Sequence, residues 1–340
     1  MLRWARSVEV DPCPWNAGTC DLAAEGGHMP LVRWMRSKDC PCGPRTSAGI
    51  ARMAGLARQI SPYALLHWAR ATGCPWDEST CNALARRGEL DTLQWARREG
   101  CPWSQQTCAE AARGGHLRVL KWLRATGCLW GPTTCSQAAL GGHLRILQWA
   151  RENKCKWNHQ TTAAAVAGGH LDILKWARSE GCHWKAKSCS QAARWGRFDL
   201  LKWLRANGCP WDASTCYEAA IAGRLDILEW VRGDPEEEKN CPWNKRACHG
   251  AARAGHLHIL RWLRMPREGS DGATFMCPWD EDVTKWAVVG GHLDVLKWAS
   301  ANGCRMKHDL VAEAAVAGHV HVRRWLLRGS EEESEKKLSS

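Results

Sequence analysis

Apolar positions along this chain recur at helical spacing in two alternating kinds of segment. From Leu117 to Arg124, leucines stand three residues apart, and Val119 and Trp122 widen the apolar stripe. The preceding segment, residues 104–113, is rich in alanine and begins with two candidate N-caps, Ser104 and Thr107. Glycines follow both segments and suit helix ends. The pattern predicts a helix, a turn, a second helix and a short loop, and it predicts no strand.

This unit of sequence repeats along the chain. The tryptophan of a W-x-R phrase returns at Trp4, Trp34, Trp68, Trp95, Trp122, Trp149, Trp176, Trp203, Trp230, Trp262, Trp298 and Trp325, most often at intervals of 27 residues. A second tryptophan, in a C-P-W phrase, precedes most first helices. Such a period indicates a solenoid. We expect one array over residues 1–329 with about eleven to twelve repeats, insertions near 234–239 and 265–275, and a disordered charged tail at 330–340.

The phrase T-x-C-x-x-A-A-x-x-G-H-L resembles the ankyrin repeat, and Gly115-His116-Leu117 aligns with the Gly-His-Leu of that family. Cys108 then stands in the place of the family's leucine. The resemblance implies an all-α, ankyrin-like helix-turn-helix solenoid that acts as a non-enzymatic scaffold for protein–protein interaction. The ankyrin repeat has 33 residues and this one has 27. The missing residues fall between Trp103 and Thr107, so we expect the β-hairpin fingers to be shortened or absent, with tryptophan contacts in their place.

Composition narrows the possible functions. The formal net charge of +12 favours acidic partners, and it also keeps a long array in solution. No nucleophile–base–acid set and no phosphate-binding glycine loop is recognisable, so we expect no enzyme and no cofactor. The first twelve residues carry charge, and no apolar run reaches the length of a membrane span. We expect a monomer without a membrane partner, in the cytoplasm or the nucleus, with reduced thiols.

The cysteines form a repeated motif of their own. Seven repeats carry Cys-x6-Cys, at Cys13/Cys20, Cys74/Cys81, Cys101/Cys108, Cys128/Cys135, Cys182/Cys189, Cys209/Cys216 and Cys241/Cys248. One hypothesis is a metal site in each repeat, but zinc takes four ligands and favours closer cysteine pairs. Thr162 and Thr284 replace the second cysteine in two other repeats. We therefore predict small buried hydrophobic side chains and no metal.

The histidine after the glycine that ends each first helix is also exchanged in some repeats. Glu89, Arg197 and Arg224 stand in its place. A catalytic or metal-binding histidine does not tolerate such exchange. We predict an interface residue at the turn between the two helices.

The resemblance implies that the concave face, where the two residues after Ala-Ala lie, binds an as yet unidentified protein partner. These positions vary most between repeats, as a binding surface on a constant framework does. Our candidate protein-binding residues are Arg86, Arg87, Arg113, Arg194, Trp195, Tyr217, Ile221 and Arg253, and Trp195 is the expected anchor.

A nucleic acid is the alternative partner. An arginine follows two places after the second-helix tryptophan in most repeats, and Lys121, Lys175, Lys202, Arg261 and Lys297 form a second basic row. Such rows could follow a phosphate backbone. The competing interpretation, which we favour, is that each arginine lies along a neighbouring tryptophan and pairs with acidic residues of the helices.

Overall fold

The computed structural model describes residues 15–53, 61–232, 240–268 and 274–328. It divides into two compact units, unit 1 up to Cys182 and unit 2 from His183. The W-x-R phrase at Trp4, the insertion at 234–239, the centre of the insertion at 265–275 and the tail at 330–340 lie outside the described residues. A single array over residues 1–329 stays a prediction.

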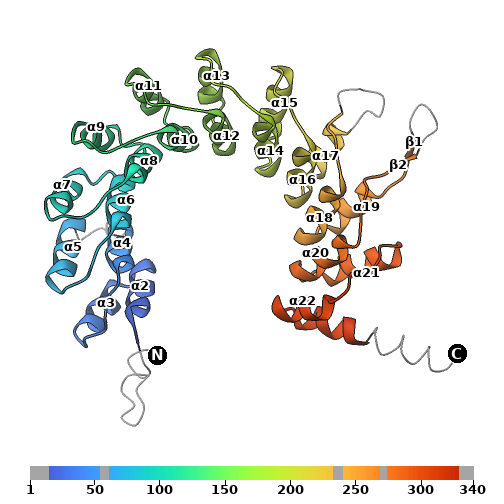
Figure 1. Ribbon diagram of the computed structural model, residues 1–340, viewed down its shortest axis with the longest axis horizontal. Coiled ribbons are helices and arrows are strands. Elements are labelled where there is room, and N and C mark those ends of the chain that lie inside the picture. Colours follow the sequence, from blue (N-terminus) through green and yellow to red (C-terminus); the bar gives the residue numbers. More distant parts are fainter. Residues whose placement is uncertain (1–14, 54–60, 233–239, 269–273, 329–340) are drawn as a thin grey trace, which may run out of the picture. The chain divides into compact units, whose positions relative to one another are not determined.

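Each repeat contributes two helices, as predicted, and they form two layers within each unit (Figure 1). The first helices of unit 1 are α2 (Ala17–Glu25), α4 (Pro44–Met53), α6 (Glu78–Arg87), α8 (Gln105–Gly114), α10 (Pro132–Gly141) and α12 (His159–Gly168). Its second helices are α3 (Met29–Arg36), α5 (Pro62–Ala71), α7 (Leu90–Arg98), α9 (Leu117–Ala125), α11 (Leu144–Glu152) and α13 (Leu171–Ser179).

Unit 2 repeats this arrangement. Its first helices are α14 (Ala186–Arg194), α16 (Ala213–Ile221), α18 (Lys245–Ala254), α20 (Asp282–Gly290) and α22 (Leu310–Val316). Its second helices are α15 (Phe198–Ala206), α17 (Leu225–Val231), α19 (Leu257–Leu263) and α21 (Leu293–Ala301). Residues 320–328 are helical after α22. None of the described helices combines the length and the apolar character that crossing a membrane requires.

Local sequence explains where the helices begin and end. In α8 the N-cap is Ser104, whose side chain accepts a hydrogen bond from a backbone N–H, and Thr107 completes a capping box three residues later. Gly115 ends the helix in the left-handed region at φ +84°, which favours glycine because it has no Cβ. The two candidate N-caps of the sequence are therefore partners in one motif.

The first helices pack directly on one another through alanine and cysteine, while the second helices pack mainly on the first helix of their own repeat. Small side chains such as Ala111 and Cys108, both fully buried, allow this close approach in the first layer. Larger side chains such as Leu120 and Leu123 fill the space under the second layer. Since the second helices stand further apart, each stack curves toward its first helices (Figure 1).

Apart from one insertion, the loops that join one repeat to the next contain no strand pairing in the described part of the chain. Residues 126–131, between α9 and α10, form a turn without strand pairing. The only described strands are β1 (Arg267–Glu268) and β2 (Thr274–Phe275), which pair antiparallel at the insertion that the sequence indicated as a loop. The expected all-helical, ankyrin-like solenoid is confirmed, with this two-residue ladder as its one departure.

A tryptophan–arginine ladder, built from the loop tryptophans, the second-helix tryptophans and the W-x-R arginines, connects the second helices. The Arg97 guanidinium of α7 lies 4.1 Å from the ring centroid of the loop residue Trp103. That ring meets Trp122 of α9 in an edge-to-face contact, with 5.7 Å between centroids. The same contacts recur from Arg124 through Trp130 to the next repeat, and in unit 2 from Arg205 through Trp211. Each such aromatic pair contributes about 1 kcal/mol beyond burial. These tryptophan contacts are the ones that we expected in place of the contacts of the missing hairpin fingers.

A histidine at the turn between helices joins adjacent repeats. Nε2 of His116 donates to the carbonyl oxygen of Arg86 at 3.0 Å, and Nε2 of His143 donates to that of Arg113 at 3.1 Å. Where Arg224 replaces the histidine, its guanidinium donates to the Gly196 carbonyl at 3.2 Å. Arginine can thus also bond a carbonyl of the preceding repeat, two residues after the one that histidine bonds, which explains why the exchange is tolerated. The predicted interface role is confirmed.

We expect Trp122→Ala to lower the free energy of unfolding by about 3 kcal/mol, because it removes a large side chain and one step of the ladder. Arg118→Ala, on the exposed side of the same helix, should change it by less than about 0.5 kcal/mol. Urea denaturation followed by tryptophan fluorescence and circular dichroism measures both. Equal effects would show that the ladder does not stabilise the stack.

A pair of glycine variants isolates the histidine contact. Gly88 and Gly100 have φ of +79° and +81°, but a Cβ on Gly88 would lie 2.4 Å from Nδ1 of His116, whereas nothing stands within 4 Å at Gly100. Gly100→Ala should cost about 1 kcal/mol, the cost of the left-handed conformation. Gly88→Ala should cost about 2 kcal/mol, because it also displaces the histidine from the Arg86 carbonyl. Thermal or urea unfolding measures the loss of stability in both variants. Equal losses would show that the contact of His116 does not stabilise the stack.

Candidate protein-binding faces

The exposed side of the first helices forms one face in each unit, which we call the first-helix face. In α18 the partly or fully exposed residues Arg246, His249 and Arg253 follow one another at helical spacing, while Cys248 and Ala251 are buried. The equivalent positions of the neighbouring helices are exposed in the same way. Each repeat therefore contributes a few side chains to this face, and their identities vary.

In unit 1 this face carries arginines at the ends of adjacent helices. Arg86 pairs with Glu110 of α8, with 3.3 Å between Nη1 and Oε2, and the Arg86 side chain remains about half exposed. Nη1 of Arg87 donates to the carbonyl oxygen of Arg52 at 2.8 Å and so links α6 to α4. These residues surround a hollow of about 580 Å³. The guanidinium of Arg113 has no ion pair among the described residues.

In unit 2 the same face carries aromatic rings. Trp195 ends α14 with 55% of its surface exposed, and its Nε1 donates to Oε1 of Gln191 at 3.1 Å. Arg194 beside it pairs with Glu218 of α16 at 3.4 Å. Tyr217 lies one helical turn before Ile221, so its ring comes from the middle of α16. The proposed anchor is thus both exposed and held in place.

The candidate residues therefore form two groups. Arg86, Arg87 and Arg113 lie in unit 1, and Arg194, Trp195, Tyr217, Ile221 and Arg253 lie in unit 2.

Sequence reasoning overlooked three residues of these faces: Arg52, Arg246 and Trp286. Trp286 had a detectable signal, because it and Trp195 are the two tryptophans outside both repeated series. Arg52 stands at the end of α4, where the repeat phrase is most degenerate. Val288, in contrast, aligns with the buried Ala112 of α8 and is itself fully buried.

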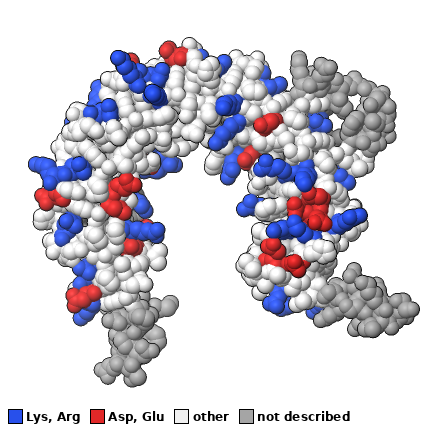
Figure 2. Space-filling view, viewed as in Figure 1, with Lys and Arg blue, Asp and Glu red and all other residues white. Residues whose placement is uncertain are grey.

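Most arginines of the first basic row are engaged in the framework. Nη1 of Arg178 donates to the carbonyl of Cys182 at 3.0 Å, and Nη1 of Arg264 donates to that of Cys277 at 2.7 Å. Guanidinium groups of this row also lie on loop tryptophans, as Arg264 does on Trp279 at 4.2 Å. The favoured interpretation, arginine along tryptophan, is confirmed, although the second partner is a carbonyl and not a carboxylate. Figure 2 shows basic side chains interspersed with acidic and uncharged ones in each unit.

The described cysteines of the Cys-x6-Cys motif are buried, as predicted, but most of them meet between repeats. Cys108 contacts Cys128 of the next repeat, and the Cys128 thiol donates to the carbonyl oxygen of Ser104 at 3.3 Å. The hydrogen bond to Cys128 and burial raise the pKa of Cys108 far above its usual range. Burial raises the pKa of Cys182 and of Cys304 to about 11. Such thiols are poor nucleophiles and poor metal ligands at neutral pH.

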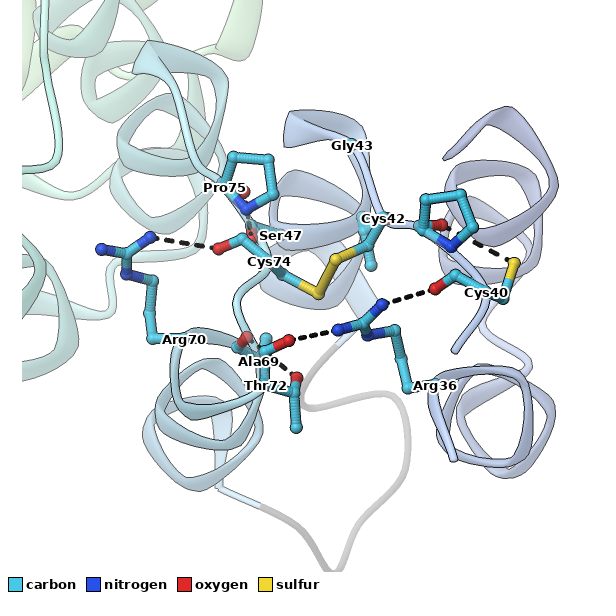
Figure 3. The surroundings of a disulfide bond; sticks show 12 residues. Arg36, Cys40, Cys42, Gly43, Ser47, Ala69, Arg70, Thr72, Cys74 and Pro75 are labelled. Atoms are coloured by element: carbon cyan, nitrogen blue, oxygen red, sulfur yellow. Dashed lines mark hydrogen bonds between the residues drawn. A yellow bond between two sulfur atoms is a disulfide. The ribbon is translucent and has the colours of Figure 1, made fainter. Parts of the chain in front are cut away.

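One disulfide differs from the expectation of reduced thiols. Cys42 and Cys74 are joined, with 5.4 Å between their Cα atoms (Figure 3). Cys42 occupies the place that the loop tryptophan holds in other repeats, so the ladder is missing there. Arg36 instead donates to the carbonyl oxygens of Cys40 and Thr72 (Figure 3). The missing aromatic step is thus replaced by a covalent and a polar link between repeats.

One group among the described residues has the geometry to hold a metal ion, His249 with Asp280 and Asp282, whose ligand atoms lie within 4.8 Å. Both carboxylates already have cationic partners, since Lys245 binds Asp280 at 2.8 Å and Lys307 binds Asp282. Burial would raise the pKa of Asp280, but the bonds from Lys245 and His249 outweigh it, and that pKa lies below its usual value. Asp280, in the loop before α20, therefore binds to α18, and Asp282, the first residue of α20, binds to the loop before α22.

Comparisons with known proteins found a similar solved structure. No family model matches the chain, and no curated protein matches it. Among solved structures, the ankyrin repeat domain of human ASB11 is similar over 57% of this chain and 88% of that one, with 17% sequence identity and a TM-score of 0.33. The fold is ankyrin-like. The helix pairs, the Gly-His turns and the stacking described above are the features that make it so.

Burial of the thiols predicts their reactivity. With 5,5′-dithiobis(2-nitrobenzoate) at pH 8, the described free cysteines should not react in the folded protein, and all should react in 6–8 M urea, a concentration of about the order that unfolds ordinary domains. Absorbance of the released thiolate counts them. Rapid reaction of several thiols without urea would mean that the core opens or that these cysteines are reactive.

Proposed function

We propose that the protein is a non-enzymatic scaffold that binds another protein through its first-helix faces. The observation that supports this most directly is the half-exposed indole of Trp195, which is fixed by Gln191 beside an ion-paired arginine. Tryptophan, tyrosine and arginine are the residues that dominate binding energy at protein interfaces. The candidate residues in both units, from Arg86 to Arg253, belong to this proposal.

The framework supports the same conclusion. Buried alanines, cysteines and leucines recur from repeat to repeat, whereas the exposed positions of the first helices differ. A constant core with variable residues on one face provides a surface that can be specific for one partner. The unit 1 face offers arginines, and the unit 2 face offers aromatic rings with arginines.

Nucleic acid is the second candidate partner, because the second basic row is exposed. Lys121, Lys175, Lys202, Arg261 and Lys297 are all exposed on the second helices. This row is the part of the basic surface that remains available for phosphate groups, since the W-x-R arginines are bound to carbonyls.

A capture experiment with the tagged full chain distinguishes the two candidates. Bound macromolecules from cell lysate are compared with and without nuclease, for wild type, for Arg194→Ala/Trp195→Ala and for Lys175→Ala/Lys202→Ala. We expect proteins to remain after nuclease and the face variant to lose affinity by roughly 30-fold, equivalent to about 2 kcal/mol. Binding that disappears with nuclease and with the lysine variant, but persists in the face variant, would assign the function to the second helices.

A further inference from the structure

The first-helix face of unit 2 combines fixed aromatic rings with a surplus of positive charge. We propose that it binds an extended protein segment in which acidic and apolar residues alternate about three residues apart. This inference rests on the proposed scaffold function and specifies the partner's chemistry. It uses an aromatic–arginine patch, which we define as Trp195, Tyr217, Trp286, Arg194, Arg246 and Arg253.

The rings of the patch are held by neighbouring helices. The Arg246 guanidinium of α18 lies 5.0 Å from the ring centroid of Tyr217, and a Cβ on Gly250 would lie 3.1 Å from that ring. Glycine at this position of α18 therefore makes room for the tyrosine. Arg253 lies 5.1 Å from the ring centroid of Trp286. Rings fixed in this way lose little conformational entropy on binding, which favours affinity.

The charges on this face do not cancel. Arg194 pairs with Glu218, and Lys285 pairs with Glu313 at 2.8 Å. At the edge of the face, Asp280 is occupied by Lys245 and His249. Two guanidinium groups of the patch, those of Arg246 and Arg253, have no carboxylate partner among the described residues.

A guanidinium that stacks on a ring still directs its N–H groups outward in its own plane. Those donors match the two oxygens of a carboxylate, which gives a strong charge-assisted bond. The surplus on this face therefore favours aspartate or glutamate side chains in the partner.

The order of side chains across the helices sets the spacing of acidic and apolar residues in the bound segment. At one equivalent position, helices α14, α16, α18, α20 and α22 carry Arg194, Ile221, Arg253, Val289 and Val316, so cationic and aliphatic side chains alternate until the last two helices. Val316 is 89% exposed. Packed helices lie about 8–10 Å apart, and an extended chain covers about 3.3–3.6 Å per residue. A segment that crosses the helices therefore advances about three residues from one to the next.

This alternation distinguishes a peptide from a nucleic acid. A phosphate backbone presents charge at every nucleotide and has no aliphatic group to place against Ile221 or Val289. A peptide with an acidic residue, then an apolar residue about three positions later, satisfies both kinds of site. Apolar side chains at the start of the segment would meet the exposed indole of Trp195.

The test is a selection of random 12-residue peptides displayed on phage against the immobilised full chain. We expect the enriched peptides to carry Asp or Glu with Leu, Ile, Phe or Trp about three residues away. A fluorescein-labelled synthetic copy of the most enriched peptide should bind at least tenfold more weakly to Arg253→Glu and to Tyr217→Ala than to wild type. Arg261→Glu, the same charge reversal at an exposed position of α19, is the matched control and should bind like wild type.

The proposal is overturned by enrichment of basic or uncharged peptides, by no enrichment, or by equal binding to Arg253→Glu and Arg261→Glu. Displacement of the selected peptide by single-stranded oligothymidylate, at a lower concentration than the unlabelled peptide requires, would also overturn it. Circular dichroism and the midpoint of urea unfolding show whether each variant is folded. If the variant Arg194→Ala/Trp195→Ala still loses captured proteins while selected peptides lack acidic residues, the scaffold function stands and only the partner's chemistry is wrong.

Discussion

The stack depends on the contact of an arginine and two tryptophans that joins one second helix to the next. The first helices touch through alanine and cysteine and need no mediator, but the second helices stand further apart. The loop tryptophan fills that gap. The arginine of one repeat lies on its face, and it makes an edge-to-face contact with the second-helix tryptophan of its own repeat, as at Arg151, Trp157 and Trp176. A pair of large rings is thus a compact substitute for a hairpin, and it allows a repeat of 27 residues.

One repeat without the loop tryptophan supports the same conclusion. Cys42 replaces the loop tryptophan, and there the link between repeats consists of the disulfide to Cys74 and the bonds of Arg36 to the Cys40 and Thr72 carbonyls. The arginine keeps its carbonyl bond to its own loop and gains one to the next repeat in place of the ring. A connection across the second layer is thus retained at this repeat, whereas its chemistry changes.

The fold could be predicted from the sequence because the same local signals recur many times. Helix periodicity, N-caps such as Ser104 and left-handed glycines such as Gly115 each fix an element, and repetition makes the assignment secure. The pairing of Cys108 with Cys128 of the next repeat could not be predicted, because it depends on how repeats stack and not on spacing within one repeat. For the same reason, Arg246 on Tyr217 escaped notice, since the two residues come from different helices.

The basic residues of the chain illustrate why charge alone is a poor guide to function. The W-x-R arginines contribute to the formal charge of +12, but their donors are directed at backbone carbonyls and their planes lie on indoles. Those carbonyls close the loop after each second helix, so removing the arginine would leave a partly buried acceptor without its partner. The charge that can attract a partner is therefore smaller than the composition indicates. It lies in the exposed row from Lys121 to Lys297 on the second helices, and in guanidinium groups of the first-helix faces, such as Arg113 and Arg253, that have no carboxylate partner among the described residues.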